Sequence, residues 1–150
     1  MSRLTILLDS SPLSVVTNPK ATPAVTSCVE WLAEHMRAGS HIIIPEITDY
    51  EVRRELLRAG KIRGIRRLDS LILKVDYLPL NTSVMRAAAQ LWARVRQTGK
   101  ATADRHALDG DVILAAQALS LSAEEVIIAT TNTKHLSRFT NAAHWSDIPL

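Results

Sequence analysis

Three acidic residues and one amide in this 150-residue sequence stand where their side chains could share a site. Asp9 follows an apolar run, Glu51 lies about two turns into a predicted helix, and Asp111 precedes the apolar stretch 112–116. Asn132 follows another apolar run. Carboxylates held a few ångströms apart repel one another, and a divalent cation relieves that repulsion. Because oxygen-only ligands select hard ions, the pattern predicts a site for Mg²⁺ or Mn²⁺.

Such an ion binds a phosphate oxygen, acidifies a water and stabilises the charge that develops in phosphodiester displacement. Each residue alone also has a simpler interpretation. Asp9 and Asn132 could cap helices, Glu51 could be a solvated helix residue, and Asp111 could favour a helix N-terminus through the dipole. The hypothesis of a metal-dependent phosphodiesterase therefore rests on the combination of the four residues.

Short apolar runs alternate with helical patterns along the whole sequence. This alternation predicts an α/β domain with a mostly parallel central sheet of about five strands. The expected strands cover about residues 4–8, 41–44, 75–78, 126–129 and the region near Trp145. The expected helices cover about residues 23–37, 46–58, 62–73, 82–98, 111–121 and 132–139, with a loop at 100–108. Active groups collect beyond the carboxyl ends of the strands in such a sheet, so the four polar side chains should meet at one edge.

Length and composition are those of one globular domain spanning residues 1–150, with 47% hydrophobic and 22% charged residues. The single cysteine, Cys28, excludes an intrachain disulfide and suits a reducing compartment. The first apolar run is too short for a signal peptide or a membrane span, so we expect a cytoplasmic protein with no membrane partner. The net charge of +3 permits a polyanionic partner without requiring one.

Other classes of site lack support in the sequence. We find no nucleophilic serine or cysteine motif and no glycine-rich phosphate loop, which argues against a dinucleotide-binding role. Trp31 and Trp92 fall in apolar helical patterns and are expected in the core, so aromatic stacking of bases is unsupported.

Four segments resemble the successive motifs of PIN domains. They occur in order and extend over nearly the whole chain, at residues 4–11 (LTILLDSS), 43–56 (IIPEITDYEVRREL), 109–119 (DGDVILAAQAL) and 127–136 (IIATTNTKHL). The resemblance implies a three-layer α/β/α domain that cleaves RNA with Mg²⁺ or Mn²⁺. It also implies that Asp9, Glu51 and Asp111 are the catalytic metal ligands.

Chain length and motif style are similar to those of toxins from bacterial type II toxin–antitoxin pairs, the virulence-associated protein C type. That similarity implies a small antitoxin partner and a homodimer. The sequence departs from the pattern at Asn132, where many relatives place an aspartate. An amide offers a carbonyl oxygen but no charge, which favours a site with one ion.

Further polar residues near these motifs are candidates for supporting roles. Ser11 and Thr130 are predicted to support the ligands or contact phosphate through their hydroxyls. Asp109, placed before the expected helix, could approach the ion through water, and Asp104 is a weaker candidate. His135 could contact phosphate or a leaving group, although a lone histidine in a short helix is more often structural.

The densest basic stretch begins beside Glu51 and extends to Arg67. Its first members, Arg53, Arg54 and Arg58, are predicted to contact RNA phosphates, which would supply salt-sensitive affinity independent of sequence. A solvated helix face, partly neutralised by neighbouring acidic residues, is the alternative interpretation.

Two other functions stay open at this point. A degenerate domain could bind RNA or protein without cutting it, and Asn132 is the best support for that interpretation. A nuclease directed at DNA is a third possibility, although flap-type relatives are longer and more acidic. The three carboxylates favour an enzyme that cleaves RNA.

Overall fold

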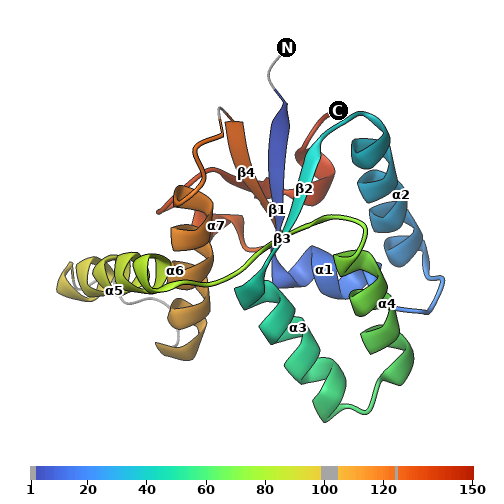
Figure 1. The fold of residues 1–150 in the computed structure, drawn as a ribbon, viewed down its shortest axis with the longest axis horizontal. Helices are drawn as coiled ribbons and strands as arrows, with labels where there is room; N and C mark the ends of the chain where they lie inside the picture. The colour runs from blue at the N-terminus through green and yellow to red at the C-terminus, as the bar shows by residue number, and fades with distance from the viewer. Residues whose placement is uncertain (1–2, 99–104, 124) are drawn as a thin grey trace.

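A computed structural model describes residues 3–98, 105–123 and 125–150 (Figure 1). Its five strands form a single sheet in the order β3-β2-β1-β4-β5, and every pair of neighbours is parallel. The strands are β1 (Leu4–Leu8), β2 (His41–Pro45), β3 (Asp76–Leu78), β4 (Glu125–Thr130) and β5 (Ala142–His144). The predicted α/β class with a parallel central sheet is confirmed.

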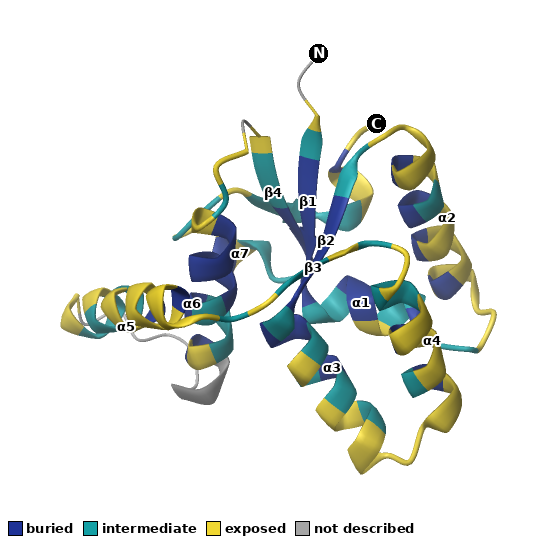
Figure 2. Cartoon of the chain, viewed as in Figure 1, coloured by how far each residue is buried: buried dark blue, intermediate teal, exposed yellow. Residues whose placement is uncertain are grey.

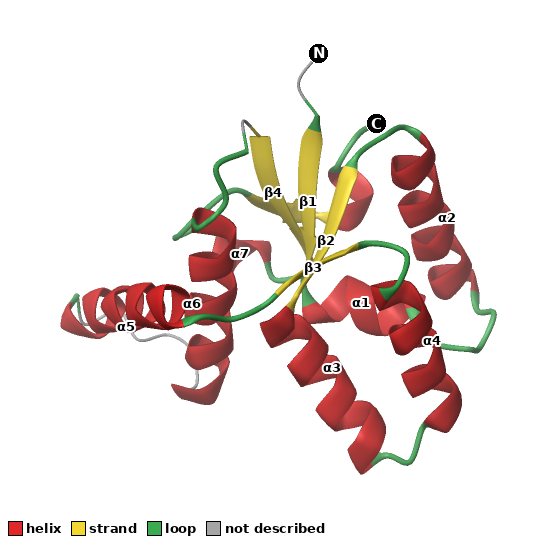
Figure 3. Cartoon of the chain, in the orientation of Figure 1, coloured by secondary structure: helices red, strands yellow, loops and turns green. Residues whose placement is uncertain are grey.

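Helices connect the strands and flank the sheet (Figure 3). They are α1 (Ser10–Val16), α2 (Pro23–Arg37), α3 (Glu46–Arg58), α4 (Ile62–Ile72), α5 (Thr82–Gln97), α6 (Arg105–Leu119) and α7 (Thr133–Leu136), followed by the 3-10 turn η1 (Trp145–Asp147). No helix in the described ranges is long and apolar enough to cross a bilayer.

Alternation along the strands divides the core into two layers. Ile6 and Leu8 of β1 face a cluster built with α1, α2 and α4, whereas Leu7 faces a second cluster built with α6 and α7. Both faces of the central strands are therefore buried, as Figure 2 shows by their dark colour between the helices. The fold has the three α/β/α layers that the resemblance implied, and α5 packs on α6 through a third apolar cluster.

Capping residues explain why several helices begin and end where the sequence predicted. The Thr22 side chain accepts a hydrogen bond from the Val25 N–H ahead of Pro23, and Asn81 caps α5 through the Val84 N–H. Gly39 and Gly60 follow α2 and α3 with φ of 87° and 65°, a conformation that glycine adopts without steric strain.

Helix α6 corrects the predicted boundaries. It begins at Arg105, so the predicted loop is wrong over residues 105–108, and Asp111 lies well inside the helix instead of opening it. Leu108 extends the apolar face of Val112 and Ala116 upstream and packs with them against α5. Residues 99–104, including the candidate Asp104, lie outside the described part of the chain.

Two short elements also differ from the prediction. Helix α1 was not predicted, because seven residues containing Pro12 give too little periodicity to recognise. The last strand ends at His144, so Trp145 belongs to the turn that follows it. Cys28 is fully buried in the core, and burial raises the pKa of its thiol to about 11.

Candidate active site

The candidate site lies where the connections of the sheet change direction. The chain runs outward from β1 to β2 and β3 on one side, and from β4 to β5 on the other. The carboxyl ends of the adjacent strands β1 and β4 therefore flank a topological switch point, where ligands bind in open α/β sheets. Asp9 follows β1 and Thr130 ends β4 at this edge, with Leu8 paired to Ala129 one residue earlier.

Asp9 is held rigidly at this edge. Its Oδ1 accepts a 2.7 Å hydrogen bond from the Ser10 backbone N–H and caps α1, so the capping interpretation is correct. Its Oδ2 accepts a 2.6 Å hydrogen bond from the Thr130 hydroxyl, and the residue is 8% exposed. The Asp9 carboxylate thus caps α1 and also lies at the switch point, beside the carboxyl ends of β1 and β4.

Hydroxyl groups tie the two strand ends together around Asp9. Thr130 Oγ1 also accepts a 2.8 Å hydrogen bond from the Asn132 backbone N–H. Ser11 Oγ accepts a 3.1 Å bond from the Thr131 N–H, which links α1 to the segment after β4. Asn132 precedes α7, and its side chain makes no capping hydrogen bond. Ser11 and Thr130 therefore lie where supporting residues were predicted.

Glu51 and Asp111 reach the same edge from opposite layers. Burial, followed by the charges of Asp9 and Asp111, raises the pKa of Glu51 from 4.5 to about 7, against the lowering effect of Arg54. Burial and the charge of Asp9 raise the pKa of Asp111 from 3.8 to about 6, against His135 and Arg138. Asp9 is near enough to oppose the ionisation of both Glu51 and Asp111, so α3 and α6 bring their carboxylates to the end of β1.

The oxygens in this cluster suit a hard divalent cation. Asp111 Oδ2 is buried and has no hydrogen-bond partner among the described residues, and the imidazole Nδ1 of His135 lies 3.8 Å from it. In that same part of the chain no three His, Cys, Asp or Glu side chains form a ready-made ligand set. Mg²⁺ keeps several waters and needs only one or two direct carboxylates, so the donor set fits such an ion.

The structure separates Asp109 from this cluster. Asp109 lies inside α6 and not before it as expected, and it lines a groove with Met85 and Trp92 of α5. Residues two apart on a helix point to different faces, so Asp109 and Asp111 diverge. Trp92 is only partly buried in this region, whereas Trp31 is buried in the core.

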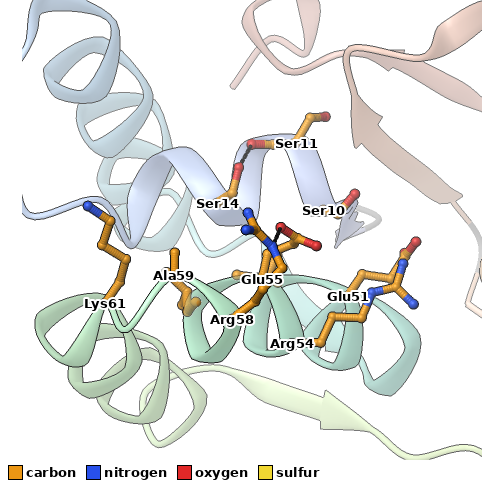
Figure 4. A pocket seen from close by; sticks show the side chains of 11 residues that line it. Ser10, Ser11, Ser14, Glu51, Arg54, Glu55, Arg58, Ala59 and Lys61 are labelled. Atoms are coloured by element: carbon orange, nitrogen blue, oxygen red, sulfur yellow. Dashed lines mark hydrogen bonds and ion pairs between the residues drawn. The ribbon is translucent and has the colours of Figure 1, made fainter.

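A cleft of about 500 Å³ leads away from Glu51 between α1 and α3 (Figure 4). Ser10, Ser11 and Ser14 form one wall. The side chains of the other wall come from α3 and the residues after it, and they include Glu51, Arg54, Glu55, Arg58 and Lys61. The cleft therefore starts at Glu51 and runs between a wall of hydroxyl groups and a wall that carries three cationic side chains.

The three arginines predicted to contact RNA differ in their surroundings. Arg54 lines the cleft beside Glu51, and its guanidinium lies 5.0 Å from the Tyr50 ring centroid. Arg58 lines the cleft and pairs with Glu55 at 3.0 Å. Arg53 does not line it and is bound to Asp49 at 3.0 Å and Asp69 at 2.8 Å.

Sequence reasoning missed one residue in the site. Gly110 lies in α6 directly against the Glu51 carboxylate. A glycine within an otherwise apolar helical pattern was the available signal, but the expected helix start at residue 111 put it outside the helix.

The chain is thus an α/β/α domain with a parallel sheet and carboxylates gathered at the switch point. Metal-dependent nucleases are among the proteins with this arrangement. The sequence model of the PIN domain family matches residues 6–141, so the chain belongs to the PIN domain family. PIN-domain nucleases generally use divalent metal ions. No curated protein matches the sequence.

Solved structures of toxin–antitoxin complexes share the fold. A chain of VapBC2 from Rickettsia felis, bound to a promoter DNA fragment, matches with a TM-score of 0.70 and 17% identity, covering 95% of this chain and 99% of that one. VapBC from Salmonella typhimurium, bound to DNA, gives 0.67 and 18%, covering 95% and 98%. VapBC-1 from nontypeable Haemophilus influenzae gives 0.64 and 17%, covering 96% and 100%.

Proposed function

We propose that this protein is a Mg²⁺- or Mn²⁺-dependent endoribonuclease and the toxin of a type II toxin–antitoxin pair. The observation that supports this function best is the gathering of Asp9, Glu51 and Asp111 at the switch point, where the charge of Asp9 raises the pKa values of both Glu51 and Asp111. Such buried, mutually repelling carboxylates are stable only when protons or a cation offset their charge.

In this proposal each residue has a defined part. Asp9, Glu51 and Asp111 would hold the ion, one or two of them directly and the rest through its waters. Thr130 fixes the orientation of Asp9 through its 2.6 Å hydrogen bond. When bound, a hard divalent cation supplies positive charge to a phosphate oxygen and lowers the pKa of a water. Asn132 adds no negative charge to the site, which favours a single ion.

The cleft between α1 and α3 provides a path for the RNA backbone. Arg54 and Arg58 would contact phosphates, and the serines of the facing wall would donate hydrogen bonds to phosphate oxygens. Arg54 lies close enough to Glu51 for its charge to lower the pKa of that carboxyl.

The partners follow from the fold relatives. The three structures named above are VapBC complexes, and this supports a small antitoxin protein as a partner. A homodimeric toxin is what the resemblance to virulence-associated protein C toxins implies. We place the reaction in the cytoplasm, where a ribonuclease toxin meets its substrate. Native mass spectrometry of the protein co-expressed with the product of its neighbouring gene would measure both associations.

The decisive experiment compares the wild type with Asp111→Asn on a mixed RNA pool, with Mg²⁺, with Mn²⁺ and with a chelator. We expect cleavage only by the wild type with metal. The variant should lose activity by about 100-fold or more, because one ligand charge is gone while the shape is kept. Circular dichroism of both proteins verifies that the fold survives.

Equal products from both proteins, or products that persist in the chelator, would refute the enzymatic assignment. Binding of RNA by both proteins without any cleavage would instead support the degenerate binding module for which Asn132 is the best evidence. Cleavage of DNA but not of RNA would identify the third candidate function.

A further inference from the structure

Gly110 occupies a position where a glycine has an energetic cost. It lies inside α6 with a negative φ, so the backbone does not require glycine there. A glycine in a helix interior is less favourable than alanine, because it loses more conformational freedom on folding. A contact with another part of the molecule must therefore explain why α6 carries one.

The contact is with the Glu51 carboxylate. A Cβ atom added at Gly110 would lie 2.8 Å from Glu51 Oε2, 3.4 Å from its Cδ and 3.6 Å from Oε1. The first distance is shorter than van der Waals contact permits, so the Glu51 carboxylate would have to move away. The missing side chain lets this carboxylate lie directly on the backbone of α6, one residue from Asp111.

The added Cβ would crowd Glu51 Oε2, and the kind of atom that is crowded determines what an alanine at position 110 would change. The atom is the free end of a flexible side chain, and the three heavy atoms nearest to the added Cβ all belong to the Glu51 carboxylate. The fold can therefore accept an alanine at position 110, whereas the position of the Glu51 carboxylate cannot stay as it is.

We propose that Gly110 is a positioning residue that sets how close the Glu51 carboxylate comes to Asp9 and Asp111. Its effect on metal binding rests on the proposed function, but its effect on the position of Glu51 does not. In this arrangement Gly110 makes α6 less stable than an alanine would, and in return the Glu51 carboxylate can approach Asp9 and Asp111.

The test uses the full chain with Gly110→Ala, and with Gly64→Ala as the matched control. A Cβ at Gly64 would lie 2.7 Å from Leu56 Cδ2, an equally close approach to a side-chain end in α3 but an apolar one. A crystal structure of each metal-free variant measures the position of the Glu51 carboxylate. Calorimetric titration with Mn²⁺ alone measures affinity, and thermal unfolding measures stability.

For Gly110→Ala we expect the Glu51 carboxylate to shift by about 1 Å or more and Mn²⁺ affinity to fall about 10-fold or more. The melting temperature should stay equal or rise. Gly64→Ala should keep the carboxylate in place and Mn²⁺ affinity within about twofold. In a Glu51→Ala background, Gly110→Ala should no longer change Mn²⁺ affinity, because the crowded group is absent.

Three outcomes would overturn the inference. One is a Glu51 carboxylate that has not moved in Gly110→Ala. Another is a Gly110→Ala protein that fails to fold, because the fold and not the site would then require the glycine. The last is equal loss of Mn²⁺ affinity in Gly64→Ala. If the wild type binds no Mn²⁺ at all, the proposed function fails, and the carboxylate position in the variant still decides the role of Gly110.

Discussion

At the scale of single residues, Glu51 is a carboxyl group whose pKa is raised by its place in the site. Its carboxylate lies against the backbone of α6, and the charges of Asp9 and Asp111 raise its pKa while that of Arg54 lowers it. Folding places the carboxylate where ionisation is unfavourable, and the unfolded chain has no such penalty. Glu51 therefore links the stability of the metal-free protein to pH.

Glu51→Gln tests this link. Folding raises the pKa of Glu51 to about 7, so ionised Glu51 destabilises the fold above pH 7, and the penalty fades as the pH falls through 7 toward 4.5. In chelator at pH 8, we expect the variant to melt about 3 °C or more above the wild type, and this advantage should shrink toward pH 5. Scanning calorimetry across this pH range measures it.

Glu55→Gln provides the comparison, since Glu55 lies on the same helix with a side chain 61% exposed and paired to Arg58. Its effect on the melting temperature should vary little over the same range. A pH-independent difference between Glu51→Gln and the wild type would show that Glu51 ionises normally in the fold.

At the scale of elements, α6 places Asp111 and is itself fixed by a buried amide. Gln117 is fully buried, its Oε1 accepts a 3.3 Å hydrogen bond from the Ile47 N–H, and its Nε2 donates a 2.8 Å bond to the Leu78 carbonyl. One side chain thus ties α6 to the start of α3 and to the end of β3. These bonds fix the relative position of the helices that carry Glu51 and Asp111.

Gln117→Leu tests how much these two hydrogen bonds contribute to stability. The substitution keeps a similar volume but leaves one buried N–H and one buried carbonyl without their partner, so we expect a loss of about 2–4 kcal/mol in the free energy of unfolding. Urea denaturation measures the loss. Gln90→Leu, at an exposed position of α5, should change stability by less than about 0.5 kcal/mol. Similar values for both variants would contradict the role of Gln117.

At the scale of the whole molecule, charge is arranged unevenly around the cleft. The net charge of +3 includes a set of arginines in α3 and α4, but some are already engaged with carboxylates. Arg53 bridges α3 and α4 through Asp49 and Asp69, whereas Arg54 lines the cleft beside the acidic cluster. Only cations that are free to meet phosphate can supply salt-sensitive affinity.

Arg54→Ala should therefore affect RNA binding, whereas Arg53→Ala should affect stability. In an Asp111→Asn background that leaves RNA uncut, Arg54→Ala should weaken RNA binding and lower the slope of log affinity against log salt by about 0.7, the value for one lost contact to a single strand. Arg53→Ala should lower thermal stability and leave that slope unchanged. Fluorescence anisotropy over a salt series gives both slopes, and identical slopes would contradict the distinction.

Local features of the sequence determined most of the architecture. Apolar runs and helical spacing located the five strands and most helices, because burial on both faces of a parallel sheet leaves continuous apolar segments. Thr22, Asn81, Gly39 and Gly60 fixed helix ends through hydrogen bonds and backbone conformations that involve only near neighbours. The position of Asp9 after β1 followed from the same local reasoning.

Only the tertiary structure decided the start of α6, the pairing of Arg53, and the approach of Gly110 to Glu51. Each depends on contacts between segments far apart in the chain: Leu108 with α5, Arg53 with Asp69, and Glu51 with the backbone 59 residues later. Periodicity reports whether a side chain is buried but not which distant atom lies against it. The sequence therefore determined which carboxylates stand near the ends of strands, and packing between layers decided how closely they meet.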